Sequence, residues 1–160
     1  MQATHQQRLL QAEQLIQEGN YAAAESQLKA LITENPNFGP AYNHLAWLAA
    51  QASDFDTADR LYRQGLTLSP NFPATYFNYL VFLRNLRRIE AMEADFKAGL
   101  AVPEIRRDKM KAEYGTGLEA AQQFDLAIEH YKESIRHAFN QEDITAFQQA
   151  IARCELKSEI

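Results

Sequence analysis

Apolar residues recur along the chain in a fixed order, separated by polar positions that repeat with them. The stretch Tyr21–Phe38 returns as Phe55–Phe72, and each matched apolar position in the second copy lies 34 residues after its counterpart in the first. A third copy begins at Phe124, where Ala127 and Tyr131 keep the same internal spacing of three and then four. A period of this length is typical of a two-helix unit that is repeated along a solenoid.

The spacing within each copy predicts how the units pack. The aromatic residue, the alanine and the next large residue fall at i, i+3 and i+7, which places them on one face of a helix. The small side chains of Ala24, Ala58 and Ala127 allow a second helix to approach closely. Pro36 and Pro70 lack the amide proton that a helix needs, so they end the helices before them. Each unit leaves an apolar face uncovered, and stacking of the next unit covers it.

The same pattern predicts an all-α protein with nine helices in a single domain, 1–160. We expect helices over Thr4–Glu18, Tyr21–Glu34, Pro40–Ala52, Phe55–Leu68, Pro73–Leu86, Ile89–Ala101, Glu104–Ala121, Phe124–Ala138 and Glu142–Glu155. They pair as units 5–38, 39–72, 73–104 and 105–140, followed by a capping helix over 142–155. Thr4 and Ser53-Asp54 are expected N-terminal caps, Gly19-Asn20 a turn, and Lys157–Ile160 a frayed end.

These positions resemble the tetratricopeptide repeat family. The second-helix pattern of that family is matched by Tyr21, Ala24, Leu28 and Pro36, by Phe55, Ala58, Tyr62 and Pro70, and by Phe124, Ala127 and Tyr131. The first-helix pattern is matched more loosely by Tyr42, Leu45, Ala46 and Ala49, and by Tyr114, Gly115 and Leu118. The resemblance implies a right-handed α-solenoid of antiparallel helix pairs.

The third unit departs from the pattern. Its first helix, Pro73–Leu86, is apolar almost all round, so it is either deeply buried or presents apolar groups to another molecule. In its second helix Met92 stands where a small alanine is expected, and Pro103 comes one residue early. We expect looser packing around this unit.

Composition narrows the class of protein. Hydrophobic residues make up 46% of the chain, which argues against disorder, and the net charge of −5 disfavours a nucleic-acid partner. No apolar run reaches the length of about 18 residues that a membrane-spanning helix needs, and the polar N-terminus is unlike a signal peptide. Cys154 is the single cysteine, so no internal disulfide is possible and a reducing, cytoplasmic setting is expected.

Candidate catalytic and metal-binding residues are few. His130 and His137 share a helix but lie seven residues apart, which is a long reach for a common metal ion. Cys154 has no histidine nearby in sequence, and no phosphate-binding or nucleophile motif occurs. The sequence therefore predicts no enzyme, no cofactor and no metal site.

The resemblance also implies a concave groove, lined by first helices, that holds an extended peptide or a partner helix. The groove positions fall on Asn43, His44, Trp47, Gln51, Phe77, Asn78, Val81, Arg84 and Asn85, with Ala50, Glu113, Thr116 and Glu119 beside them. Asparagine can hydrogen-bond a peptide backbone, aromatic rings offer stiff contact area, and arginine can hold a carboxylate.

We therefore expect a protein-binding adaptor with a protein or peptide partner. Alternatively, Trp47 and Phe77 only fill the inner curve of the solenoid. Two other functions are separate alternatives: a small chaperone that masks an apolar client segment, and a self-associating structural module that forms homo-oligomers, which the apolar helix Pro73–Leu86 suggests.

Overall fold

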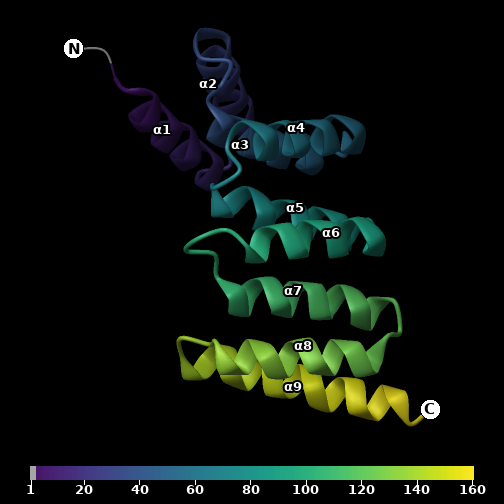
Figure 1. Cartoon of the computed structure of the whole chain (residues 1–160). Helices are drawn as coiled ribbons and strands as arrows, with labels where there is room; N and C mark the ends of the chain where they lie inside the picture. Colours follow the sequence, from purple (N-terminus) through teal and green to yellow (C-terminus); the bar gives the residue numbers. More distant parts are fainter. Residues whose placement is uncertain (1–2) are drawn as a thin grey trace. The chain divides into compact units, whose positions relative to one another are not determined.

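The computed structural model describes residues 3–160, and all the regular structure in that range is helical (Figure 1). The helices are α1 His5–Gln17, α2 Tyr21–Glu34, α3 Gly39–Gln51, α4 Phe55–Leu68, α5 Pro73–Asn85, α6 Ile89–Leu100, α7 Arg107–Ala120, α8 Phe124–Arg136 and α9 Gln141–Ser158. Residues 3–160 contain no strand. The predicted all-α helical-repeat class is confirmed.

Helix starts follow the capping chemistry that the sequence predicts. Thr4 Oγ1 accepts a hydrogen bond from the Gln7 backbone N–H at 3.2 Å, and Gln7 Oε1 accepts one from the Thr4 N–H at 2.8 Å. This reciprocal capping box satisfies two amide donors at the start of α1. At the start of α4, the Asp54 carboxylate accepts a hydrogen bond from the Thr57 N–H at 3.3 Å.

The turn between the two helices of each pair repeats as faithfully as the helices do. Gly19, Ser53, Arg87 and Gln122 have φ values of 77°, 61°, 56° and 61°, in the left-handed region. Only the first of these four is glycine, the residue that adopts this backbone without strain. Each residue lies two positions before a second helix, so the same tight turn joins every pair.

The structure resolves into two compact units, one ending at Thr75 and the other covering Tyr76–Ile160, with the boundary in the first turn of α5. In the first unit, α2 packs against α1 and α3, and α3 packs against α4. In the second, α7 packs against α6 and α8, and α9 lies along α8 (Figure 1). The single domain over 1–160 and the handedness of a continuous solenoid remain predictions.

Small residues occupy the helix contacts where the repeat pattern requires them. Ala24, Ala58 and Ala127 are fully buried, as expected. In α7, a Cβ atom at Gly115 would lie 3.2 Å from the Tyr131 ring, so glycine lets α7 and α8 approach closely. These contacts reproduce in space the order of large and small residues in the sequence.

The looser packing expected around Met92 is not found. Met92 is fully buried, and its Cε atom lies where a Cβ atom at Gly117 would be, at 2.4 Å. The long side chain on α6 therefore occupies the space left by a glycine on α7. The apolar side chains of α5 are mostly buried as well, and they include Tyr76, Tyr79, Leu80, Phe82 and Leu83.

Two predicted helix ends are wrong by three residues, and the other ends lie within two residues of the prediction. Helix α7 begins at Arg107 and not at Glu104, because Glu104 has φ 64° and belongs to the linker between α6 and α7. Pro103 lies one residue earlier than the period of 34 predicts, and this linker takes up that difference. Helix α9 continues to Ser158, two residues into the end that was expected to fray. Lys157 is held there by an ion pair with Glu119 at 2.9 Å.

Candidate functional site

The predicted groove residues of α3 lie along one side of that helix, at three- and four-residue spacing. Asn43 is fully buried, His44 and Trp47 are half-buried, and Gln51 is exposed. Burial places the Asn43 amide beneath the surface, whereas the other three side chains reach solvent. This side of α3 therefore offers a partner an imidazole, an indole and an amide.

His44 is already engaged within the first unit. Its Nε2 atom lies 3.0 Å from Glu13 Oε1 on α1, and both side chains are largely shielded. Burial lowers the pKa of His44 below its ordinary value, while the Glu13 carboxylate acts in the opposite direction. The pair joins two successive first helices, which gives His44 a structural role at this surface.

Trp47 forms an aromatic pair with Tyr21, the first residue of α2. The two rings meet edge to face, with centroids 5.6 Å apart and an interplanar angle of 82°. Tyr21 remains 43% exposed and Trp47 is half-buried, so both rings present apolar surface to solvent. Edge-to-face packing holds each ring in a defined orientation.

The predicted groove residues of the second unit lie on α5. Phe77, Asn78 and Val81 are half-buried, and Asn85 is exposed. Arg84 is also half-buried, and its Nε atom lies 2.8 Å from Glu113 Oε2 on α7. The guanidinium that was expected to hold a partner's carboxylate therefore already has a carboxylate beside it.

The groove positions of α7 are tied to neighbouring helices. Glu119 accepts hydrogen bonds from Arg153 on α9 at 2.7 and 2.8 Å and from the Tyr131 hydroxyl at 3.2 Å. The Arg153 guanidinium, aided by the Lys157 ammonium, holds the pKa of Glu119 at about 2. Thr116 Oγ1 lies 3.1 Å from the Tyr131 hydroxyl, whose pKa burial raises to about 12.

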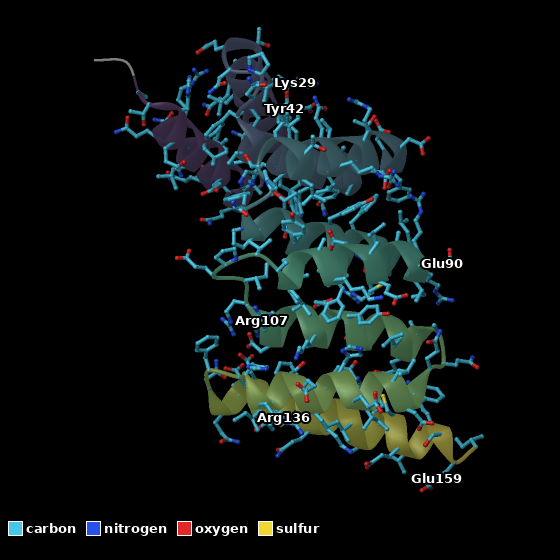
Figure 2. The ribbon with its side chains drawn as sticks, in the orientation of Figure 1. Lys29, Tyr42, Glu90, Arg107, Arg136 and Glu159 are labelled. Atoms are coloured by element: carbon cyan, nitrogen blue, oxygen red, sulfur yellow. The ribbon has the colours of Figure 1, made fainter. Side chains whose placement is uncertain are left out.

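Sequence reasoning missed a cleft on the other side of α3. It has a volume of about 510 Å³ and runs between α2 and α4, with α3 as its floor. Its lining residues are Glu25, Lys29, Ile32, Tyr42, Leu45, Leu48, Ala49, Ala52, Asp54, Thr57, Arg60, Leu61 and Gln64. Lys29 and Tyr42, both labelled in Figure 2, lie on its wall.

The cleft combines an apolar floor with a charged rim. Leu45, Leu48 and Leu61 are almost completely buried and form the floor, while Lys29 and Arg60 are exposed at the edges. On a helix of 3.6 residues per turn, Leu45 and Ala49 lie opposite the predicted groove positions. The α3 helix therefore presents two different surfaces, of which the repeat pattern suggested only one.

Two buried titratable groups lie apart from both surfaces. Asp95 on α6 is 6% exposed, and neither of its carboxylate oxygens has a hydrogen-bond partner among the described residues. Burial raises the pKa of Asp95 to about 8. Cys154 is a buried free thiol, and burial, with the Glu119 carboxylate, raises its pKa as well.

Residues 3–160 contain no group of three or more His, Cys, Asp or Glu side chains placed to hold a metal ion. Over the same residues, every helix is too short or too polar to cross a bilayer.

Comparison with known proteins identifies the repeat. A family model described as tetratricopeptide repeat matches residues 15–74. No curated protein matches the chain at the level of sequence.

Solved structures with the same fold are numerous, at sequence identities that show the fold alone. A structure of PilF from Pseudomonas aeruginosa superposes with a TM-score of 0.86 at 19% identity, over 97% of this chain and 69% of that one. PilW, a type IV pilus biogenesis factor, gives 0.75 at 22% identity, over 85% of this chain and 63% of that one. MamA from Desulfovibrio magneticus RS-1 gives 0.79 at 14% identity, over 99% and 88%.

Proposed function

We propose that the chain is a tetratricopeptide-repeat protein and a non-enzymatic adaptor that binds a segment of another protein. The repeat fold is a protein-interaction module in general. The proposed binding surface is the side of the first helices that carries Trp47 and Gln51 in the first unit. The second unit has a corresponding surface of its own on α5, which carries Phe77, Asn78, Val81, Arg84 and Asn85.

The observation that carries the proposal is the exposed pair of Tyr21 and Trp47. Tryptophan and tyrosine are enriched among the residues that dominate binding energy at protein interfaces. Their edge-to-face contact orients both rings before a partner arrives, which lowers the entropy lost on binding. A pair of rigid rings at the surface is suited to an apolar side chain of a bound peptide.

The charged groups on the first helices of each unit, taken separately, support a neutral or mixed segment over a strongly acidic one. His44 lies against Glu13, and Arg84 lies against Glu113, so each cationic position already faces a carboxylate. A partner's carboxylate would have to displace these acidic side chains and meet their repulsion. The proposed partner therefore contacts this surface through apolar and amide groups.

The setting of this activity is part of the proposal. The only cysteine, Cys154, is an unpaired thiol, as is typical of proteins in a reducing compartment such as the cytoplasm. A chaperone that masks an apolar client segment would use the same exposed rings. It would differ in staying bound to one client throughout purification.

Titration of peptides selected from a random display library tests the proposal. For peptides that bind this surface, Trp47→Ala is expected to weaken binding at least tenfold, because it removes the central ring and leaves Tyr21 unsupported. Gln148→Ala, at an exposed position of α9, is the matched control and should leave affinity unchanged. If every selected peptide binds Trp47→Ala as tightly as the unmodified protein, the assignment of this surface is wrong.

A further inference from the structure

The cleft between α2 and α4 has a counterpart in the second unit, between α6 and α8. The two sites share an ion pair on the helix that forms one wall. Glu25 and Lys29 on α2 are joined at 2.5 Å, and Glu93 and Lys97, 68 positions later on α6, are joined at the same distance. The two sites can therefore be compared residue by residue.

In the second unit, aromatic side chains fill this site. The rings of Phe96 on α6 and Tyr114 on α7 stack at 4.6 Å with an interplanar angle of 14°. His130 on α8 meets both rings edge-on, at 5.3 Å from Phe96 and 4.9 Å from Tyr114. Burial raises the pKa of Tyr114, and the Glu93 carboxylate adds to the effect, so the phenol lies beside the shared ion pair.

In the first unit, the same three positions carry aliphatic side chains. Leu28, Leu45 and Leu61 stand where the second unit has Phe96, Tyr114 and His130, and all three are buried. Leucine lacks the length and the flat surface of an aromatic ring, so the space above Leu45 and Leu61, which both line the cleft, stays open over about 510 Å³. The fold can thus house an aromatic group at this position, and the first unit does not supply one.

The rim of the open cleft indicates the charge of its occupant. Lys29 is neutralised by Glu25, and Asp54 is engaged as the cap of α4. Arg60 is exposed and forms no ion pair within residues 3–160. The equivalent position in the filled site is the acidic Glu129. The open cleft therefore has one cation without a counter-charge, beside an apolar floor.

We propose that this cleft binds an aromatic side chain of a partner protein, with an aspartate or glutamate beside it in the partner's sequence. The ring would lie on Leu45 and Leu61 next to the Glu25–Lys29 pair, as Tyr114 lies beside Glu93 and Lys97. The neighbouring carboxylate would pair with Arg60. Charge complementarity of this kind sets the specificity of an interface more than its affinity, while a ring in a desolvated pocket supplies an anchor.

This docking site is separate from the surface of Trp47, because the two lie on opposite sides of α3. A partner could therefore engage one without the other. The volume of the cleft is within the range of about 300–1,000 Å³ that is typical of small-molecule pockets, so an aromatic side chain has room to enter it.

Nuclear magnetic resonance of methyl groups tests the position of the ring directly. The probes are synthetic peptides with one phenylalanine or tyrosine next to a glutamate, and matched peptides with leucine in place of the ring. Aromatic ring currents are expected to shift the methyl signals of Leu45, Leu48 and Leu61 upfield, and the leucine peptides should produce no such shift. Unchanged methyl signals at saturating concentrations of every aromatic peptide would overturn the proposal.

Two variants give the first unit a residue that the second unit has at the equivalent position. Ala49→Leu, which matches Leu118, fills the cleft, and Arg60→Glu, which matches Glu129, reverses the charge of the rim. Each is expected to weaken binding of the aromatic–acidic peptides at least tenfold. Lys132→Glu, an equal change of charge at an exposed position of α8, is the control and should have no effect. Circular dichroism establishes that each variant is folded.

Other occupants give different results. If the peptides lose affinity with Trp47→Ala but not with Ala49→Leu or Arg60→Glu, they bind the proposed adaptor surface and the cleft proposal is wrong. If the unmodified protein forms a dimer that Ala49→Leu abolishes, a second copy of the chain occupies the cleft, which also overturns it. Loss of binding with the cleft variants alone supports the docking site even where the Trp47 surface binds nothing.

Discussion

The open cleft of the first unit and the aromatic cluster of the second are built from the same parts of the same repeat. Each lies between two second helices, over the first helix that separates them, and each keeps a Glu–Lys pair on its wall. Leucines at three positions of the first site are replaced in the second by two stacked rings and a histidine, and other lining residues differ as well, among them Ala49 against Leu118 and Arg60 against Glu129. The repeat determines where the helices lie, and the side chains next to the invariant contacts determine whether the space between them is filled.

The two sites differ in what their side chains contribute to the stability of each unit. Aromatic pairs contribute about 0.5–1.5 kcal/mol beyond the burial of their area, so the filled site stabilises the second unit. The first unit forgoes that contribution at the same position and retains an accessible apolar floor. An unfilled position in a repeat protein is therefore a guide to surfaces that the family pattern does not mark.

The largest expected effect comes from emptying the filled site. Phe96→Ala should lower the free energy of unfolding of the second unit by about 3–5 kcal/mol, because it removes a buried ring and its contacts with Tyr114 and His130. Urea denaturation followed by circular dichroism measures the change. Phe139→Ala, at a ring that is 75% exposed, is the control and should cost less than about 1 kcal/mol. Equal losses for the two variants would show that the cluster adds nothing to stability.

A second prediction concerns one helix contact at which the large and the small side chain stand on opposite helices in the two units. The second unit pairs Met92 with Gly117, where the first has Ala24 and Leu48 at the equivalent positions. Met92→Ala alone should cost about 2–4 kcal/mol by leaving a cavity, and Gly117→Leu alone about 1–3 kcal/mol by overpacking. Because the double variant restores the arrangement of the first unit, it should recover at least about 1 kcal/mol relative to the sum of the two losses. Strict additivity in the denaturation data would contradict the exchange.

The smallest effect concerns the buried carboxyl group of Asp95, where the preceding repeat has Leu61. Because burial raises the pKa of Asp95 to about 8, the folded state keeps its proton while the unfolded state loses it near pH 4. Stability should therefore be greatest below about pH 4 for this group and fall as the pH rises toward about 8. Asp95→Asn should remove that slope and gain about 1–3 kcal/mol near pH 8.

Denaturation midpoints at about pH 5 and pH 8 measure this contribution of Asp95. Asp125→Asn, at an exposed carboxyl group of α8, is the control and should leave the pH dependence as it is in the unmodified protein. An unchanged slope in the Asp95→Asn protein would mean that the buried group is already ionised in the folded state over this pH range.

Much of the fold could be predicted from the sequence, because the residues that recur in each repeat are those that make the contacts within and between helix pairs. The bounds of Tyr21–Glu34 and Phe55–Leu68 are predicted to the residue, and the buried alanines follow from their spacing. The linker after α6 could not be predicted in the same way. There the backbone takes a left-handed conformation at Glu104, a residue whose side chain gives no signal for it.

The candidate site was less predictable, because its properties depend on pairs of residues far apart in the chain. The positions of His44 and Arg84 on first helices follow from the repeat, but their carboxylate neighbours, Glu13 and Glu113, do not. The open cleft was missed because it is defined by the absence of bulk at Leu45 and Leu61. A comparison of those leucines with Tyr114 and His130 along the repeat was the signal that could have revealed it.

The contacts of Glu119 with Tyr131, Arg153 and Lys157 restrict how this chain can be shortened or extended. Its carboxylate is mostly shielded and depends on Arg153 and Lys157 for its counter-charge. A truncation before residue 153 would leave the Glu119 carboxylate beside the Tyr131 hydroxyl without its two cations. It would therefore destabilise the packing of α7 against α8 as well as remove part of α9. Affinity tags and fusion partners for the experiments above are therefore best joined beyond residue 158, where α9 has already ended.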